Sequence, residues 1–224
     1  RETVDYLNAQ GRKVGFVQVH LFRPFSIGRL LDAIPETALR IAVLDRCKEM
    51  GSAGEPLYQD VCTAFSQSER CPLIVGGRYG LSSKDTTPAH IGGVYENLRS
   101  AKPLNGFTIG IVDDLTHLSL APDAKIPQGR EGVFACKFWG LGSDGTVGAN
   151  RNTVEIISKH TDFYGQAYFE YDAKKSFGIT KSHLRFSKAP IDSSYLVRNA
   201  DFIACHHQTF VSQYDMVSEL LPGG

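Results

Sequence analysis

Apolar and amphipathic stretches alternate along the first half of the chain. Four apolar runs predict β-strands, at residues 14–22, 40–45, 72–80 and 106–112. Three amphipathic runs between them predict helices, at residues 26–34, 55–67 and 86–100. Ser26 suits the N-cap of the first helix, and Pro56 suits the first turn of the second. Strands that alternate with helices in this way indicate a layered α/β domain with a mainly parallel sheet.

A polar stretch then separates two parts of the chain. Residues 121–133 contain two prolines and two glycines, a composition typical of a linker. We therefore predict a first domain at 1–122, a linker at 123–133 and a second domain at 134–224. The second domain again alternates, with strands predicted at 134–142, 167–172, 182–187 and 200–207. Its predicted helices are 146–160 and 212–221, and the strand at 182–187 is a candidate edge strand.

Composition excludes several classes of protein. Of the 224 residues, 42% are hydrophobic, enough for one large core or two ordinary ones. Lysine and arginine together number 24, as do aspartate and glutamate, so no net field favours nucleic acid or a membrane surface. No apolar run approaches the roughly 18 residues of a membrane span. The five cysteines contain no CxxC pair, which argues against a zinc site or an iron–sulfur cluster in this segment.

A glycine pattern marks the most promising chemistry. Gly140, Gly142 and Gly145 form G-x-G-x-x-G between a predicted strand and a predicted helix. Such a turn brings backbone N–H groups close to a phosphate, and the Ser143 hydroxyl adds a further donor. Asp144 opposes an anion, because its carboxylate would repel a phosphate unless it turned away. A tight turn without any ligand explains the same glycines.

Histidines give a weaker indication. His206 and His207 close the apolar strand at 200–207, where ligands often bind in α/β sheets. No third metal ligand accompanies them in the sequence, so we interpret both as capping or packing residues.

Seven motifs in one order, covering nearly the whole chain, resemble a single enzyme family. They are LFRPFS (21–26), IAVLDRCKEMGSAGEPLYQDV (41–61), IVGGRYGLSSKDTTP (74–88), IVDDLTHLSL (111–120), KFWGLGSDGTVGAN (137–150), FEYDAKKSFGITKSHLRF (169–186) and ADFIACHH (200–207). This is the pyruvate:ferredoxin (flavodoxin) oxidoreductase family. The resemblance implies a transketolase C-terminal-like domain followed by the start of a gamma-type domain that is truncated here. It also implies two layered α/β domains with mainly parallel sheets.

The resemblance further implies the reaction of the parent enzyme. Pyruvate is oxidatively decarboxylated with coenzyme A (CoA), giving acetyl-CoA and CO2, and electrons pass to ferredoxin or flavodoxin. The family uses thiamine diphosphate, Mg2+ and iron–sulfur clusters, which the resemblance assigns to parts outside this segment. No catalytic residue and no metal ligand are therefore expected here. The implied role of the segment is scaffold, interface and CoA contacts.

The CoA contacts are expected around the glycine turn. The resemblance places the nucleotide end of CoA in the second domain, and a lysine ammonium suits its phosphates. We therefore predict contacts from Lys174 and Ser143, with Lys175, Gly142 and Gly145 also candidates, and with Asn150 bracing the turn. Two solvated lysines in a turn are the competing interpretation.

Partners and location follow only from the family. The remaining domains of the same polypeptide and a homodimer are expected, in the cytoplasm or a hydrogenosome-like organelle. Three alternatives stay open: a fused pyruvate:NADP oxidoreductase, a non-catalytic relative that keeps the fold, and an independent nucleotide-binding protein. The sequence downstream of this segment would separate the first, and loss of the thiamine-binding motif would mark the second. Tight nucleotide binding by the isolated fragment would indicate the third.

Overall fold

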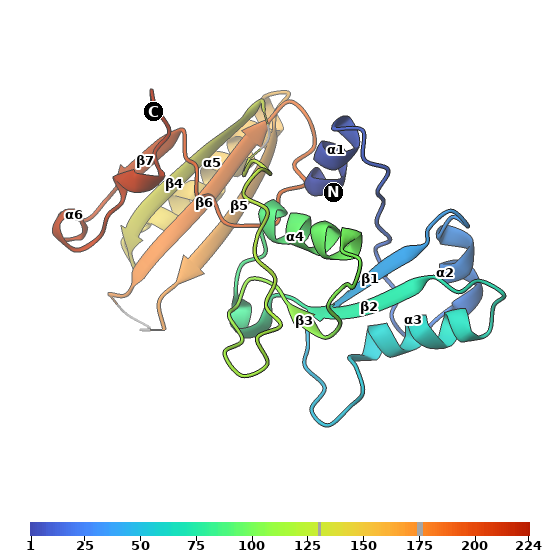
Figure 1. Cartoon of the computed structure of the whole chain (residues 1–224). Helices are drawn as coiled ribbons and strands as arrows, with labels where there is room; N and C mark the ends of the chain where they lie inside the picture. The colour runs from blue at the N-terminus through green and yellow to red at the C-terminus, as the bar shows by residue number, and fades with distance from the viewer. Residues whose placement is uncertain (130, 174–176) are drawn as a thin grey trace. The chain divides into compact units, whose positions relative to one another are not determined.

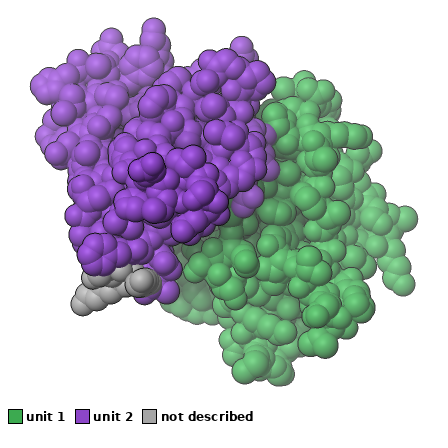
Figure 2. All heavy atoms as spheres, turned by 90° about the vertical axis from the view of Figure 1, so that its left-hand side faces the viewer, with its two compact units in different colours: residues 1–127 green, residues 128–224 purple. Residues whose placement is uncertain are grey.

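The chain folds into two compact units. A computed structural model describes residues 1–129, 131–173 and 177–224. Unit 1 is Arg1–Pro127 and unit 2 is Gln128–Gly224 (Figure 2). The boundary falls within the stretch expected to be a linker, whose first half packs on unit 1. There the Asp123 amide donates to the Ala89 carbonyl at 2.8 Å, and the Ile126 side chain is buried.

Unit 1 is built on a three-stranded parallel sheet. Its strands are β1 (Arg40–Asp45), β2 (Leu73–Arg78) and β3 (Phe107–Thr108), in the order β1-β2-β3 (Figure 1). The expected α/β class with a parallel sheet is therefore confirmed for this unit. The fourth predicted strand is shorter than expected: it ends at Thr108, and Gly110 soon after has a left-handed φ of 77°.

Helices cover both faces of this sheet. Side chains alternate along β1, so that Ile41 and Val43 pack on one side and Ala42 and Leu44 on the other. Helices α2 (Ile27–Ala33) and α3 (Pro56–Ser66) cover the first side, and α4 (Pro88–Arg99) covers the second (Figure 1). Ser26 is the N-cap of α2, as predicted, although its side chain makes no capping hydrogen bond. A further helix, α1 (Glu2–Ala9), precedes them.

The apolar run at 14–22 does not form the predicted strand. Its backbone pairs with side chains instead of with a neighbouring strand. The Val14 amide donates to Asn8 Oδ1 at 3.0 Å, and the Tyr95 hydroxyl donates to the Gly15 carbonyl at 2.8 Å. Phe16 and Leu21 are largely exposed, so the alternation of side chains in this run does not reflect burial in unit 1.

Unit 2 contains a mixed sheet. Its strands are β4 (Val133–Leu141), β5 (Tyr164–Tyr171), β6 (Ile179–Ser187) and β7 (Phe202–Cys205), in the order β5-β6-β4-β7. Strand β6 pairs antiparallel with both of its neighbours, and only β4 and β7 run parallel. The expectation of a mainly parallel sheet is wrong here. The connection between β5 and β6 is too short for the crossover that a parallel pair requires. The suggested edge strand is also wrong, since β6 lies inside the sheet.

One long helix covers one face of this sheet. Helix α5 (Thr146–His160) has the predicted bounds. Val154 and Ile157 on α5 pack against Cys136, Leu184 and Phe186 of the sheet. The glycine turn connects the end of β4 to the start of α5, so the packing of this helix on the sheet fixes where the turn lies.

The opposite face of the sheet carries polar side chains on β5 and β6, which bind a strap of chain, residues 193–197. Gln166 Nε2 donates to the Ser193 carbonyl at 2.7 Å, and Arg185 Nη2 donates to the Tyr195 carbonyl at 2.7 Å. The Val197 amide donates to Nδ1 of the buried His183 at 3.1 Å. Every second residue of the strap is thus fixed by a side chain of the sheet. His183 and Arg185, which sequence alternation places on one face, serve this packing.

The predicted helix at 212–221 is broken. A short helix α6 (Phe210–Gln213) ends where Tyr214 is extended, and a 3₁₀ turn follows at Val217–Glu219. Tyr214 lies with its ring centroid 5.5 Å from that of Trp139. Packing on this tryptophan therefore overrides the local helical pattern. No helix among the described residues is long and apolar enough to cross a bilayer.

Candidate functional site

The glycine turn lies where two parallel strands of unit 2 end. Strand β4 finishes at Leu141 and β7 at Cys205, and both finish at the same edge of the sheet. Residues 142–145 connect β4 to the first turn of α5. The carboxyl ends of parallel strands, together with a helix N-terminus, form the usual place for an anionic ligand in α/β folds.

Two of the glycines allow close packing around this turn. A Cβ at Gly140 would lie 2.7 Å from the Cβ of Thr146, so only glycine lets α5 approach β4 this closely. The Gly142 amide donates to the Gly178 carbonyl at 2.7 Å. This hydrogen bond attaches the end of the β5–β6 connection, residues 172–178, to the glycine turn. The Gly142 amide is therefore occupied and is not available to a ligand.

Asp144 caps the turn from within. Its Oδ1 accepts from the Thr146 amide at 2.8 Å and its Oδ2 from the Leu141 amide at 2.7 Å. Partial burial acts to raise the pKa of Asp144, but the hydrogen bonds from the two amides and the charge of His206 outweigh it and lower the pKa. A carboxylate thus already occupies part of the helix N-terminus, and any anion must bind beside it.

Asp144→Asn is expected to lower the free energy of unfolding at neutral pH, because asparagine has one acceptor oxygen for the two amides and carries no charge. Folding lowers the pKa of Asp144, so its stabilisation is present above the ordinary value of 3.8 and is lost as the pH falls through the folded value. Urea unfolding of both forms at neutral pH and at about pH 3 checks this. A difference in stability that stays constant in acid would contradict the role of the charge.

Several polar groups at the turn remain available to a ligand. The amides of Val147 and Gly148 in the first turn of α5 bond to none of the described residues. A Cβ at Gly148 would meet no atom within 4 Å, so this side of the helix is open. Ser143 is exposed, with a left-handed φ of 75°, and Gly145 is the N-cap with φ 89°.

The other predicted contact residues divide into two groups. Asn150 is buried, and its Nδ2 has no hydrogen-bond partner among the described residues, so its bracing of the turn stays a prediction. Lys174 and Lys175 lie outside the described residues. Both belong to the β5–β6 connection, which ends at Gly178 beside the turn.

The sequence did not indicate one neighbour of the turn. His206, directly after β7, has its Nδ1 2.8 Å from the Thr146 hydroxyl, and its amide donates to the Trp139 carbonyl at 2.9 Å. These contacts support its interpretation as a packing residue. A histidine at the end of an apolar strand was the available signal, but only the parallel pairing of β4 with β7 places it at α5. Across the described residues, no three His, Cys, Asp or Glu side chains cluster as metal ligands.

Comparison with known families covers both units. Residues 1–91 match the family described as pyruvate:ferredoxin oxidoreductase core domain II, and residues 135–224 match pyruvate ferredoxin/flavodoxin oxidoreductase. The chain belongs to the pyruvate:ferredoxin/flavodoxin oxidoreductase family. The core domain II match precedes the second match along the chain, in the same order as the motifs that resemble this family.

Individual relatives in the family align along the entire chain. A pyruvate:ferredoxin oxidoreductase of Moorella thermoacetica is 53% identical over 223 residues, and a pyruvate-flavodoxin oxidoreductase of Enterobacter agglomerans is 55% identical over 225. Each alignment covers 100% of this chain but 19% of the relative. A protein of Euglena gracilis named mitochondrial pyruvate dehydrogenase [NADP(+)] is 49% identical over 226 residues, which is 12% of its length. The chain thus spans about one fifth of the bacterial relatives.

Proposed function

We propose that this chain is a segment of an enzyme that oxidatively decarboxylates pyruvate with CoA. Pyruvate and CoA give acetyl-CoA and CO2, and two electrons pass to ferredoxin or flavodoxin. The observation that carries the proposal is the alignment of the whole chain, at 53% and 55% identity, with two bacterial proteins named for this activity. We assign thiamine diphosphate, Mg2+ and the iron–sulfur clusters to the rest of the polypeptide, and we expect the parent to be a homodimer.

Within this enzyme, we assign CoA contacts to unit 2. The amides of Val147 and Gly148, which bond to none of the described residues, and the exposed Ser143 hydroxyl provide donors at the start of α5. Lys174 and Lys175 supply positive charge from a connection that closes on the turn at Gly178. We assign to these lysines the positive charge that a phosphate needs beside the Asp144 carboxylate. We therefore assign the phosphates of CoA to the helix side of the turn, and Gly142 to packing.

The proposed activity is tested with the intact protein. We expect reduction of a viologen dye that depends on both pyruvate and CoA. Absence of this reaction in a preparation loaded with thiamine diphosphate and clusters would favour a non-catalytic member of the family, which keeps the fold for scaffold or interface.

A second candidate has NADP+ as the electron acceptor. The Euglena relative aligns with the same segment at 49% identity, so these residues suit either enzyme. Ferredoxin, flavodoxin and NADP+ supplied separately in the same assay distinguish the two, because only the fused form would reduce NADP+ without an added reductase.

A further inference from the structure

The phosphate site proposed at the start of α5 has two sides, and their charges differ. The sheet order β5-β6-β4-β7 puts β5 and β7 at opposite edges (Figure 1). His206 follows β7 and reaches Thr146, and its charge acts on Asp144, so the carboxylate belongs to the β7 side. An anion that avoids this carboxylate has to bind on the β5 side of the helix.

Arg151 lies on the β5 side of α5. Its guanidinium carbon is 5.3 Å from the centroid of the Phe169 ring, and Phe169 belongs to β5. A cation–π contact of this kind holds an arginine by its flat face and leaves the N–H groups at its edge free to donate. Arg151 is exposed, and its guanidinium forms no hydrogen bond or ion pair with the described residues.

The carboxylate with the most favourable spacing to Arg151 is already paired. Glu155 lies four residues further along α5, the spacing at which opposite charges meet on a helix. It pairs instead with Lys159, and the hydrogen bond from this lysine lowers the pKa of Glu155. Among the described residues, Arg151 is thus a positive charge that the fold positions without neutralising it.

The helix directs this charge toward its own first turn. Val147 and Gly148 precede Arg151 by four and three residues, so all three share one side of α5. Side chains on a helix lean toward its N-terminus, which brings the arginine over the turn whose amides bond to none of the described residues. A Cβ at Gly148 would meet no atom within 4 Å, so the space beside this turn is open. A guanidinium and two amides in this arrangement suit one phosphate group.

An exposed aromatic ring lies next to this position. Tyr171 is two residues beyond Phe169 on β5, so its side chain is on the same, helix-facing side of the sheet. In the strand register it is level with Gly140 through Thr180, at the edge where the glycine turn begins. Tyr171 is 59% exposed, and its hydroxyl bonds to none of the described residues. A flat, open ring beside a phosphate position matches the planar base of a nucleotide.

Two carboxylates flank this surface, and neither pairs with Arg151. Asp144 accepts from the Leu141 and Thr146 amides on the β7 side. Asp172 follows Tyr171 and continues the ladder to β6, so alternation places its side chain on the opposite face of the sheet. The described contacts therefore leave a net positive charge on the helix-facing side of β5.

We propose that Arg151 and Tyr171 bind the nucleotide end of CoA, with a phosphate on Arg151 and adenine on the Tyr171 ring. This inference rests on the proposed use of CoA and adds two contacts outside the glycine pattern. An arginine held by a ring loses little freedom on binding, and its fork of N–H groups matches the oxygens of a phosphate. The surface thus recognises a phosphate that carries a planar base, and not the pantetheine arm of CoA.

Isothermal titration calorimetry of the intact protein with adenosine 3′,5′-bisphosphate tests both contacts without turnover. Arg151→Gln removes the charge and is expected to weaken binding about tenfold to a hundredfold, the effect of losing one charged contact. Arg151→Lys keeps the charge without the fork, so it should recover part of this loss. Tyr171→Ala should weaken binding about fivefold to a hundredfold, the usual cost of removing a ring on which a base stacks. Inorganic pyrophosphate has no base, so its affinity should be the same for Tyr171→Ala and the wild type.

Arg29→Gln and Tyr164→Ala are the matched controls. Arg29 is exposed on α2 in unit 1, and Tyr164 is 52% exposed at the other end of β5. Each control makes the same chemical change as its test variant, away from the start of α5. Both controls should bind the nucleotide as the wild type does.

The outcomes separate this inference from the proposed reaction. A loss of affinity in Arg151→Gln and Tyr171→Ala that neither control shows supports the two contacts. Wild-type affinity in either variant, or no nucleotide binding by the wild type, overturns them. An equal loss of pyrophosphate binding in Tyr171→Ala would show that the ring supports the fold rather than a base, and would also reject the proposal. An active enzyme whose variants bind normally rejects these contacts alone, whereas an inactive one that binds the nucleotide through them rejects the proposed reaction alone.

Discussion

Lys174→Ala is expected to raise the KM for CoA about tenfold to a hundredfold, while the KM for pyruvate stays nearly unchanged. This is the effect of losing one charged contact to a phosphate, about 1.5–3 kcal/mol. The same variant should narrow the gap between CoA and CoA that lacks its 3′-phosphate, because the lysine would no longer distinguish them. Steady-state kinetics of viologen reduction by the intact enzyme measures both quantities.

Lys159→Ala is the matched control for this substitution. Lys159 lies in the last turn of α5, at the opposite end from the glycine turn, and among the described residues it pairs with Glu155 alone, on the surface. Its removal should leave both KM values unchanged. An unaltered KM for CoA in Lys174→Ala would reject the contact between Lys174 and CoA. It would not contradict the proposed oxidation of pyruvate.

Gly140→Ala is expected to destabilise unit 2 by about 1–3 kcal/mol, the usual cost of forcing a methyl group into a packed contact. The new Cβ would lie 2.7 Å from both the Cβ and the hydroxyl of Thr146, which begins α5 and bonds to His206. The helix would have to move away from β4. Thermal unfolding followed by circular dichroism should show a Tm lower by about 4–8 °C per kcal/mol.

Gly148→Ala is the control with the opposite sign. The position is helical and a Cβ there meets no atom within 4 Å, so alanine should stabilise the protein by about 0.5–1 kcal/mol. Two identical substitutions in neighbouring turns should thus shift the Tm in opposite directions. Equal shifts would contradict the packing explanation for Gly140.

Local patterns in the sequence predicted correctly those elements whose formation tertiary contacts do not change. β1 and α5 have the expected bounds, since each combines a clear apolar pattern with signals at its ends. The run at 14–22 has the same alternation, but no strand of unit 1 pairs with it among the described residues. The helix expected at 212–221 was lost to packing of Tyr214 on Trp139. Periodicity reports which face is apolar, whereas pairing and packing decide whether the element forms.

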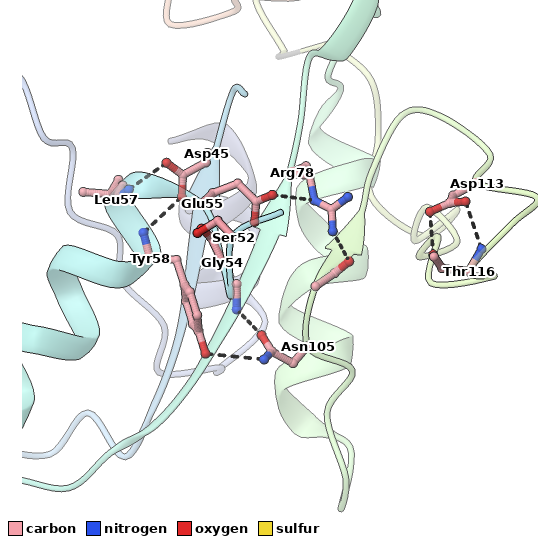
Figure 3. A network of polar contacts seen from close by, with 12 residues as sticks. Asp45, Ser52, Gly54, Glu55, Leu57, Tyr58, Arg78, Asn105, Asp113 and Thr116 are labelled. Carbon is pink, nitrogen blue, oxygen red and sulfur yellow. Dashed lines mark hydrogen bonds and ion pairs between the residues drawn. The ribbon is translucent and has the colours of Figure 1, made fainter. Parts of the chain in front are cut away.

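The glycine turn and a pocket of unit 1 show the same limit. Glycine spacing located the turn at 140–145, because close backbone approach leaves a direct mark on sequence. It did not reveal that Asp144 accepts from the Leu141 and Thr146 amides, which depends on the local path of the turn. Nor did it reveal that His206 reaches Thr146, which depends on the pairing of β4 with β7. In unit 1, a pocket at the carboxyl ends of β1 and β2 brings together Glu55, Tyr58, Arg78 and Asn105 (Figure 3). No motif connects them, because their proximity arises only when β1 and β2 align.

The hydrogen bond from the Gly142 amide to the Gly178 carbonyl has a consequence for engineering. It gives the β5–β6 connection and the glycine turn a common anchor. Residues inserted into or deleted from 173–177 would change the distance over which Lys174 and Lys175 act, with the turn itself untouched. With the proposed CoA contacts, we expect loop length alone to alter the selectivity of unit 2 among anions, and libraries of loop variants would leave the glycines unchanged.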